Sequence, residues 1–261
     1  MDIKSSEDKI IFLGTGGARV MISTQLLASG GIWLSLGDTQ ILIDPGPGAI
    51  VQVNKRKLKP KNLEAILLSH RHLDHSNDTN VMIEAMTMDS PRRRGYFFAP
   101  ADALGEEPVI YSYLKESLNG IEVLSEGSSY QVGQVRFSTP VRHMHPVETY
   151  GFLFEIEKHR FAYIADTRYF DGLSVYRSDL LIMNVVFMEP HPTIDHLAIP
   201  DVKTLVQDLK PKVAIITHFG MSVFRAHPWE IARELSDETG VKVIAARDGM
   251  GFDLNKLDEI P

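Results

Sequence analysis

The sequence predicts an α/β fold in which two β-sheets pack face to face and helices lie on the outside. Two blocks of short apolar segments with strand composition are each followed by an alternation of helix and strand patterns. The chain has 261 residues, and no Pro/Gly/Ser-rich stretch or charge block divides it. We therefore expect residues 1–261 to form one domain with a full hydrophobic core.

The first block is predicted to be a β-meander that leads into a buried strand. Glycine and proline turns separate its apolar runs, and Pro45–Gly48 ends the meander. The glycines at 14, 16 and 17 predict a tight turn, because Arg19 occupies the third glycine position of a nucleotide-binding loop. The expected strands of this block are 10–13, 32–36, 41–44 and 63–69, with a short helix at 50–54.

The middle of the chain begins with a predicted helix that runs from a cap at Asn77 or Asp78 through Thr87. Val81, Met82, Ala85 and Met86 are spaced to form one apolar face of this helix. The later expected strands are 96–99, 121–124, 130–132, 134–138, 150–156, 160–165, 180–185, 213–217 and 241–246, with a turn at 157–159. The later expected helices are 109–118, 201–209 and 228–238, and Asp248–Gly249 is expected to end the last strand in a turn that closes the site.

Composition limits the function classes. Hydrophobic residues make up 44% and charged residues 23%, and no apolar run approaches the roughly 20 residues that a membrane span requires. The polar N-terminus does not resemble a signal peptide, so the cytoplasm is the expected compartment. Without cysteine, any metal must be held by histidine and carboxylate, and a net charge of -7 argues against nucleic-acid binding through the overall field.

A cluster of ligand-type residues follows the predicted strand at 63–69. The segment His70-Arg71-His72-Leu73-Asp74-His75 places three histidines and an aspartate in six residues. Imidazole and carboxylate are donors that zinc, manganese and iron accept, and alternate residues of an extended chain point the same way. His70 and His72 are therefore expected to face one ion, and Asp74 and His75 a second.

Three further candidates stand just after predicted buried strands or apolar segments, where catalytic groups commonly lie. They are His145, Asp166 and His218. Each alone is more readily explained as a capping or structural residue than as a ligand, because loop ends favour aspartate and tolerate histidine. Their recurrence with the cluster favours a dinuclear site, which needs more than four protein ligands.

The order of these residues resembles the metallo-β-lactamase superfamily over nearly the whole chain. The resemblance implies an αββα four-layer sandwich, with two mixed sheets flanked by helices and a two-metal site between the sheet edges. It implies that His70, His72 and His145 hold one divalent ion, that Asp74, His75 and His218 hold the other, and that Asp166 bridges them. Zinc is the expected metal, with manganese and iron as alternatives.

Short sequence segments are most similar to the ribonuclease Z and phosphodiesterase branch of this superfamily. They are Phe12–Gly16, His145–Phe152 and Asp166–Arg168, with His196 where that branch keeps a further catalytic histidine. His145 stands five residues before an aromatic-Gly-aromatic triplet, as the family's ligand does. This favours His145 over His143, although His143 on an extended chain could face the same way. No Gly/Pro-rich basic arm of the kind that clamps tRNA lies between the cluster and His145.

The expected mechanism is metal-assisted hydrolysis, in which a hydroxide bridging two cations attacks the substrate. Asp74 is expected to ligate metal and to orient or deprotonate the water, and His196 to donate a proton or stabilise a phosphoryl oxygen. An ordinary loop histidine is the alternative for His196. Asp44 is interpreted as a residue that orients a metal-bound imidazole, or as a turn-forming aspartate before Pro45.

The leading functional hypothesis is a phosphodiesterase acting on a nucleotide or a related small phosphodiester. His196 and the basic segments Lys55–Lys61 and Arg92-Arg93-Arg94 favour phosphate. Hydrolysis of a thioester, lactone or β-lactam is the second hypothesis, since it uses the same ligands. Non-hydrolytic di-iron redox chemistry is the third. RNA remains open as a substrate, no membrane partner is expected, and the sequence leaves open whether the chain forms a homo-oligomer.

Overall fold

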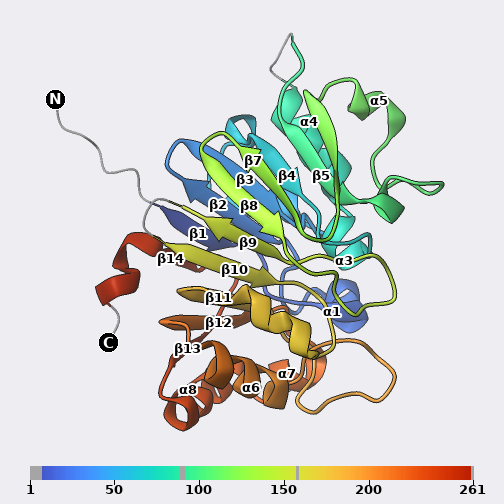
Figure 1. Cartoon of the computed structure of the whole chain (residues 1–261). Helices are drawn as coiled ribbons and strands as arrows, with labels where there is room; N and C mark the ends of the chain where they lie inside the picture. The colour runs from blue at the N-terminus through green and yellow to red at the C-terminus, as the bar shows by residue number, and fades with distance from the viewer. Residues whose placement is uncertain (1–7, 89–91, 157–158, 260–261) are drawn as a thin grey trace, which may run out of the picture.

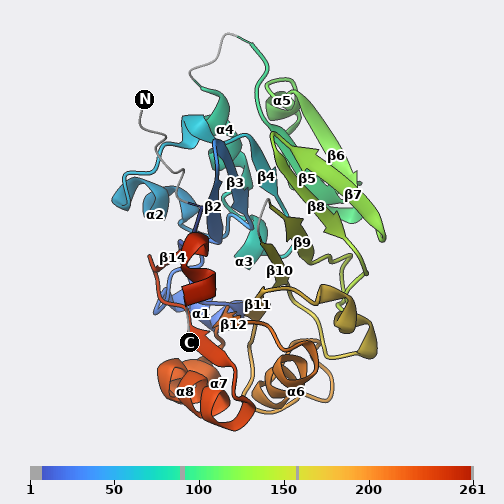
Figure 2. The same cartoon turned by 60° about the vertical axis from the view of Figure 1, so that its left-hand side comes forward.

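Two seven-stranded β-sheets stack face to face with helices on their outer surfaces, as the computed structural model shows (Figure 1). The structure describes residues 8–88, 92–156 and 159–259. The turned view separates the layers, with α2 and α4 beside the first sheet and α6 and α8 beside the second (Figure 2). The predicted αββα sandwich with two mixed sheets is therefore confirmed.

The first sheet combines the predicted meander with three parallel strands. Its strands β14, β1, β2 and β3 pair antiparallel in that order, whereas β3, β4, β5 and β6 run parallel. In spatial order they are β14 (Gly251–Asp253), β1 (Lys9–Phe12), β2 (Ile32–Leu36), β3 (Thr39–Ile43), β4 (Ala65–Leu67), β5 (Tyr96–Pro100) and β6 (Gly120–Leu124).

The second sheet has the same two-part construction. Strands β13, β12, β11 and β10 run parallel, and β10, β9, β8 and β7 pair antiparallel. In spatial order they are β13 (Lys242–Ala245), β12 (Val213–Thr217), β11 (Leu180–Asn184), β10 (Arg160–Ile164), β9 (Phe152–Glu155), β8 (Val135–Thr139) and β7 (Ser128–Val132). Because strands β10 to β12 run parallel, their carboxyl ends meet at one edge of the sheet.

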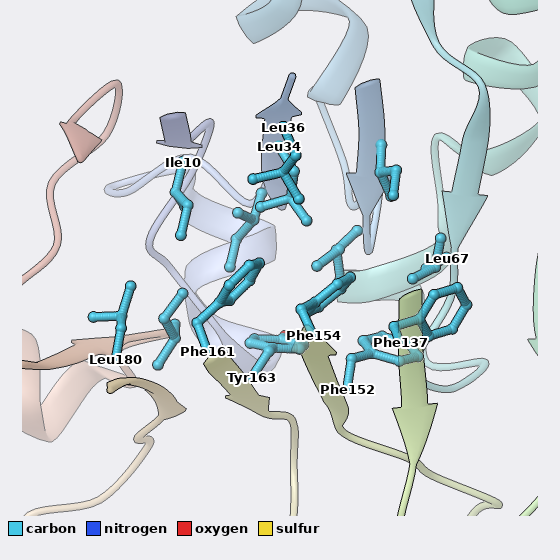
Figure 3. Packing of buried hydrophobic residues seen from close by; sticks show 14 of the residues in the cluster. Ile10, Leu34, Leu36, Leu67, Phe137, Phe152, Phe154, Phe161, Tyr163 and Leu180 are labelled. Atoms are coloured by element: carbon cyan, nitrogen blue, oxygen red, sulfur yellow. The ribbon is translucent and has the colours of Figure 1, made fainter. Parts of the chain in front are cut away.

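The central core lies between the two sheets. Alternate residues of each strand point inward, and buried aliphatic side chains of the first sheet meet a row of aromatic rings from the second (Figure 3). Phe154 and Phe161 stack with ring centroids 4.5 Å apart. The labelled residues of this core are Ile10, Leu34, Leu36, Leu67, Phe137, Phe152, Phe154, Phe161, Tyr163 and Leu180.

Helices bury the outer face of each sheet. Trp33, Ile66 and Phe97 of the first sheet belong to one core cluster with α4 residues, and Leu181 and Met183 of the second belong to another with residues of α6 and α8. The helices are α1 (Ala18–Thr24), α2 (Ala49–Lys55), α3 (Leu73–Ser76), α4 (Thr79–Thr87), α5 (Ser112–Lys115), α6 (Ile199–Leu209), α7 (Met221–Arg225) and α8 (Pro228–Thr239). The 3₁₀ turns are η1 (Pro60–Asn62), η2 (Ala101–Ala103), η3 (Asp171–Tyr176) and η4 (Leu254–Glu259).

Three details of the predicted elements were wrong. The helix expected at 109–118 is only α5, since the rest of that segment forms turns. In α4 the buried face contains Ile83, whereas Val81 is 42% exposed. The chain continues after Asp248–Gly249 into β14, which pairs with β1, so β13 is not the last strand. Residues 157–158 of the expected turn lie outside the described residues.

Candidate dinuclear metal site

The candidate site lies where the parallel strands of both sheets end. β4 leads through Ser69 into His70, α3 carries Asp74 and His75, and β10 and β12 end directly before Ala165-Asp166 and His218. Asp74 and His75 lie in the short helix α3 and not in extended chain. Helical geometry nevertheless directs these neighbouring side chains to the same group of ligand atoms.

Three imidazoles form the first group of ligand atoms. His70 Nε2 lies 3.1 Å from His72 Nδ1, and His145 Nε2 lies 3.0 Å from the same nitrogen. In a tetrahedral zinc site with bonds of about 2.0–2.1 Å, neighbouring ligand atoms stand about 3.3 Å apart. The spacing of the three nitrogens therefore suits one ion held by three histidines.

The second group combines two carboxylates and two imidazoles from Asp74, His75, Asp166 and His218. His218 Nε2 lies 3.4 Å from Asp74 Oδ2 and 3.5 Å from Asp166 Oδ1. His75 Nε2 lies 3.4 Å from Asp166 Oδ2, and His70 Nε2 of the first group lies 3.9 Å from the same oxygen. Asp166 therefore stands between the two groups, where a carboxylate can bridge two ions.

Burial and charge divide the two groups electrostatically. Burial lowers the pKa of His70, His72 and His145, so these imidazoles are neutral, which is the form that coordinates a metal. Burial acts most strongly on His218 and lowers its pKa, but the Asp166 and Asp74 carboxylates together outweigh burial and raise that pKa to about 9. The second group thus attracts positive charge, which a metal ion would supply in place of protons.

Two buried histidine nitrogens without a hydrogen-bond partner provide an independent test of whether a metal ion fits the second group. Among the described residues, His75 Nε2 and His218 Nε2 are buried and have no hydrogen-bond partner. Unpaired buried polar atoms are costly and rare in folded proteins. Two such atoms that face carboxylates 3.4 Å away are suited to coordinate a cation.

Asp44 orients the His75 ring through a hydrogen bond to Nδ1, the ring nitrogen that does not face the second group. Its carboxylate accepts hydrogen bonds from Ser69 N at 2.7 Å, Ser69 Oγ at 2.7 Å, His75 Nδ1 at 2.9 Å and Tyr163 OH at 2.9 Å. Because Nδ1 of His75 donates to Asp44, Nε2 is the ring nitrogen left to coordinate a metal in the second group. The geometry therefore favours the orienting role of Asp44 over a simple turn role.

The N-terminal glycine turn supports the opposite side of the second group. Ala18 N donates to Asp74 Oδ2 at 2.9 Å, and Gly17 N donates to the carbonyl of Phe219, next to His218. A Cβ at Gly17 would overlap the His218 imidazole. The carboxylate of Asp248 fixes the same turn, because its Oδ1 accepts from both Thr15 N and Thr15 Oγ1.

His143 and His196, whose roles the sequence left open, have different surroundings. His143 is buried and contacts Tyr176 OH through Nε2 and the Asp166 carbonyl through Nδ1, so it does not join the ligand groups. His196 does reach the site, with its ring 5.2 Å from that of His145 and its Nδ1 3.4 Å from Asp166 Oδ2. Its side chain is 12% exposed, and Nδ1 has no hydrogen-bond partner among the described residues.

Asn184 is a site residue that the sequence interpretation missed. At the end of β11, its side-chain amide donates to Asp166 Oδ1 at 2.9 Å and to Tyr163 OH at 3.0 Å. The only sequence signal was a polar residue near the end of a buried strand, the same position at which Asp166 and His218 were identified. Asn184 links Asp166 to the hydrogen bonds around Asp44.

Residues 39–219 match the family described as the β-lactamase superfamily domain. A curated relative, an uncharacterized protein of Methanocaldococcus jannaschii, is 32% identical over 94% of this chain and 95% of its own length. A ribonuclease Z of Thermococcus sibiricus is 35% identical over 41% of this chain, which spans only 33% of that enzyme. The metallo-β-lactamase fold protein YhfI of Bacillus subtilis superposes with a TM-score of 0.79 at 20% identity, over 95% of this chain and 99% of its own.

Proposed function

We propose that this chain, which belongs to the β-lactamase superfamily, is a phosphodiesterase of the ribonuclease Z-like branch. Membership of the superfamily supports the broader assignment as a metal-dependent hydrolase. The proposed substrate is a nucleotide or a related small phosphodiester. The partial match to ribonuclease Z supports the choice of a phosphodiester substrate. No helix within residues 8–88, 92–156 and 159–259 has the length and hydrophobicity of a membrane span.

The proposed ligands are the two groups of side chains described above. His70, His72 and His145 would hold one ion, and Asp74, His75 and His218 the other, with Asp166 between them. Zinc suits this donor set of imidazole and carboxylate, and manganese and iron accept it as well. Two bound cations would lower the pKa of water and stabilise negative charge on the reacting oxygens.

Protein side chains would perform the positioning and proton transfers. Asp74, held through Oδ2 by the backbone of Ala18, would orient the attacking water and accept its proton. His196 would face the substrate from beside His145 and donate a hydrogen bond or a proton to the phosphoryl or leaving oxygen. No side chain need form a covalent bond to the substrate.

The observation that carries the phosphodiester proposal is the position of His196. A partly exposed imidazole beside the ligand groups supplies a hydrogen-bond donor in addition to the metals. A phosphodiester has two non-bridging oxygens and a leaving alkoxide that use such a donor. Acyl hydrolysis of a thioester or lactone remains the second candidate, because the same ligands serve both reactions.

The test is a metal analysis of the purified protein with a substrate panel. We expect about two metal ions per chain and turnover of bis-p-nitrophenyl phosphate, with weaker turnover of thioesters and lactones. The variant His196→Ala should lose phosphodiester turnover while its metal content stays unchanged. Activity on acyl substrates alone, or undiminished phosphodiester turnover by the variant, would overturn the proposal.

A further inference from the structure

A cleft lies away from the metal ligands, between α8 and the edge strand β13. Its volume is about 620 Å³, within the range of small-molecule pockets, and none of the seven proposed ligands lines it. The wall nearest the metal site is formed by Thr15 and Phe219, which are joined by a hydrogen bond of 2.7 Å from Phe219 N to the Thr15 carbonyl. The cleft is therefore separate from the site described above.

The lining of the cleft is apolar with one large exposed aromatic ring. Phe219, Phe224, Leu27 and Met250 contribute apolar surface. Trp229, at the start of α8, is 59% exposed, although indole is among the more hydrophobic side chains. An exposed tryptophan at the rim of an apolar hollow offers a flat face for a ring or an alkyl group.

The charged residues of the cleft favour an anion. Arg233, Lys242 and Arg247 line it and are exposed, and none of them forms an ion pair with another described residue. Two carboxylates also line the cleft, Asp237 and Asp248, and Asp248 already accepts hydrogen bonds from Thr15 and Ala28. Three unpaired cations therefore gather here on a chain whose net charge is -7.

The edge of β13 argues against an added β-strand as the occupant. Ser236 of α8 covers this edge, because its Oγ accepts from Val243 N at 2.9 Å and its one hydrogen is shared between Ala232 O at 2.7 Å and Val243 O at 3.2 Å. An extended peptide would need these two backbone groups for the main-chain ladder. A small molecule needs only the apolar lining and the charged rim.

We propose that this cleft binds a small organic anion with an aromatic or apolar body, packed against Trp229 and paired with Arg233 and Arg247. The proposal is independent of the phosphodiesterase function, since neither the ligand nor its binding involves the metal ligands. Arginine is suited to the anionic group, because its planar guanidinium can pair with a carboxylate, sulfonate or phosphate through two hydrogen bonds.

The test uses 8-anilinonaphthalene-1-sulfonate, an aromatic anion, with the purified metal-loaded protein. Trp229 lines the cleft and Trp33 lies in the core of the first sheet, so the part of the energy transfer from tryptophan to the bound probe that is lost in W229F reports a position beside Trp229. We expect saturable binding of one probe per chain with energy transfer. The neutral analogue N-phenyl-1-naphthylamine should bind at least tenfold more weakly.

Variants locate the site and test the charge requirement. The double variant R233Q/R247Q should weaken probe binding at least tenfold, whereas R136Q, an exposed arginine of β8, should leave it unchanged. W229F should remove most of the energy transfer while the protein keeps its fold and its hydrolytic activity. Equal binding of the neutral analogue, no loss of binding in R233Q/R247Q, or energy transfer that W229F leaves unchanged would each overturn the proposal.

Discussion

Replacing Asp44 by asparagine should weaken metal binding at the second ligand group without unfolding the protein. Asp44 is 3% exposed and its φ is 51°, in the left-handed region that asparagine also tolerates. The asparagine side chain in D44N can therefore keep the backbone conformation and still accept the hydrogen bond from Ser69 N. The substitution isolates the loss of Oδ2, which accepts from Ser69 Oγ, His75 and Tyr163.

The effect on the metal follows from the tautomer of His75. An amide at the Oδ2 position would donate to His75 Nδ1 and place the ring proton on Nε2, the atom that faces Asp166. A hydrogen bond to a charged group contributes about 1.5–3 kcal/mol, which corresponds to about 10–150-fold in affinity. Partners of metal ligands contribute a similar 10–100-fold, so we expect the second ion to bind about 10–100 times more weakly.

The assay is a competition titration of both ions against a chelator of known affinity, with unfolding of the chelated protein measured in urea. D253N is the matched control. Asp253 lies in β14, away from the site, and its carboxylate accepts a hydrogen bond from Asn255 N. Its metal affinity should equal that of the unmodified protein. A second-ion affinity for D44N within threefold of that value would refute the role assigned to Asp44.

Three further outcomes test the same site. Chelation should lower Tm by roughly 8–16 °C for each ion removed if the free metal had been about 1,000 times Kd, because each bound ion then adds about 4 kcal/mol. An unchanged Tm in a thermal melt would contradict this. Gly17→Ala should displace His218 and reduce metal content toward one ion per chain, whereas Gly105→Ala, whose Cβ meets no atom closer than 3.7 Å, should retain both ions by elemental analysis. His196→Ala should reduce kcat for a phosphodiester about 100-fold or more with full metal content, and a change confined to KM would count against proton donation.

The sequence predicted most of the fold because its elements are locally encoded. Buried strands such as β2 and β12 are apolar runs with clear turn boundaries, and α8 has a periodic apolar face. The short elements α1, α3, α7 and β14 were not predicted, since three to seven residues carry too little periodicity. Tertiary packing decides the conformation of such segments.

The candidate ligands were identifiable in sequence because their chemistry is distinctive. Imidazoles and carboxylates directly after buried strands have few structural explanations when they recur together. The choice of His145 over His143 rested on a resemblance, and the tertiary structure supplies the physical reason. His143 lies against Tyr176 and the Asp166 backbone, whereas His145 donates from Nδ1 to the Asp195 carbonyl and turns Nε2 toward His72.

Residue identity was enough to indicate the type of chemistry, because it fixes which atoms can bind a metal, and hydrophobic periodicity indicated which segments are buried. The orientation of the ligands and the other features of the molecule depend on tertiary packing. Asp44, Asn184 and the cleft at Trp229 depend on residues far apart in the chain, and no local pattern encodes their contacts. Hydrogen-bond geometry and shared cavities exist only after the two sheets have packed together.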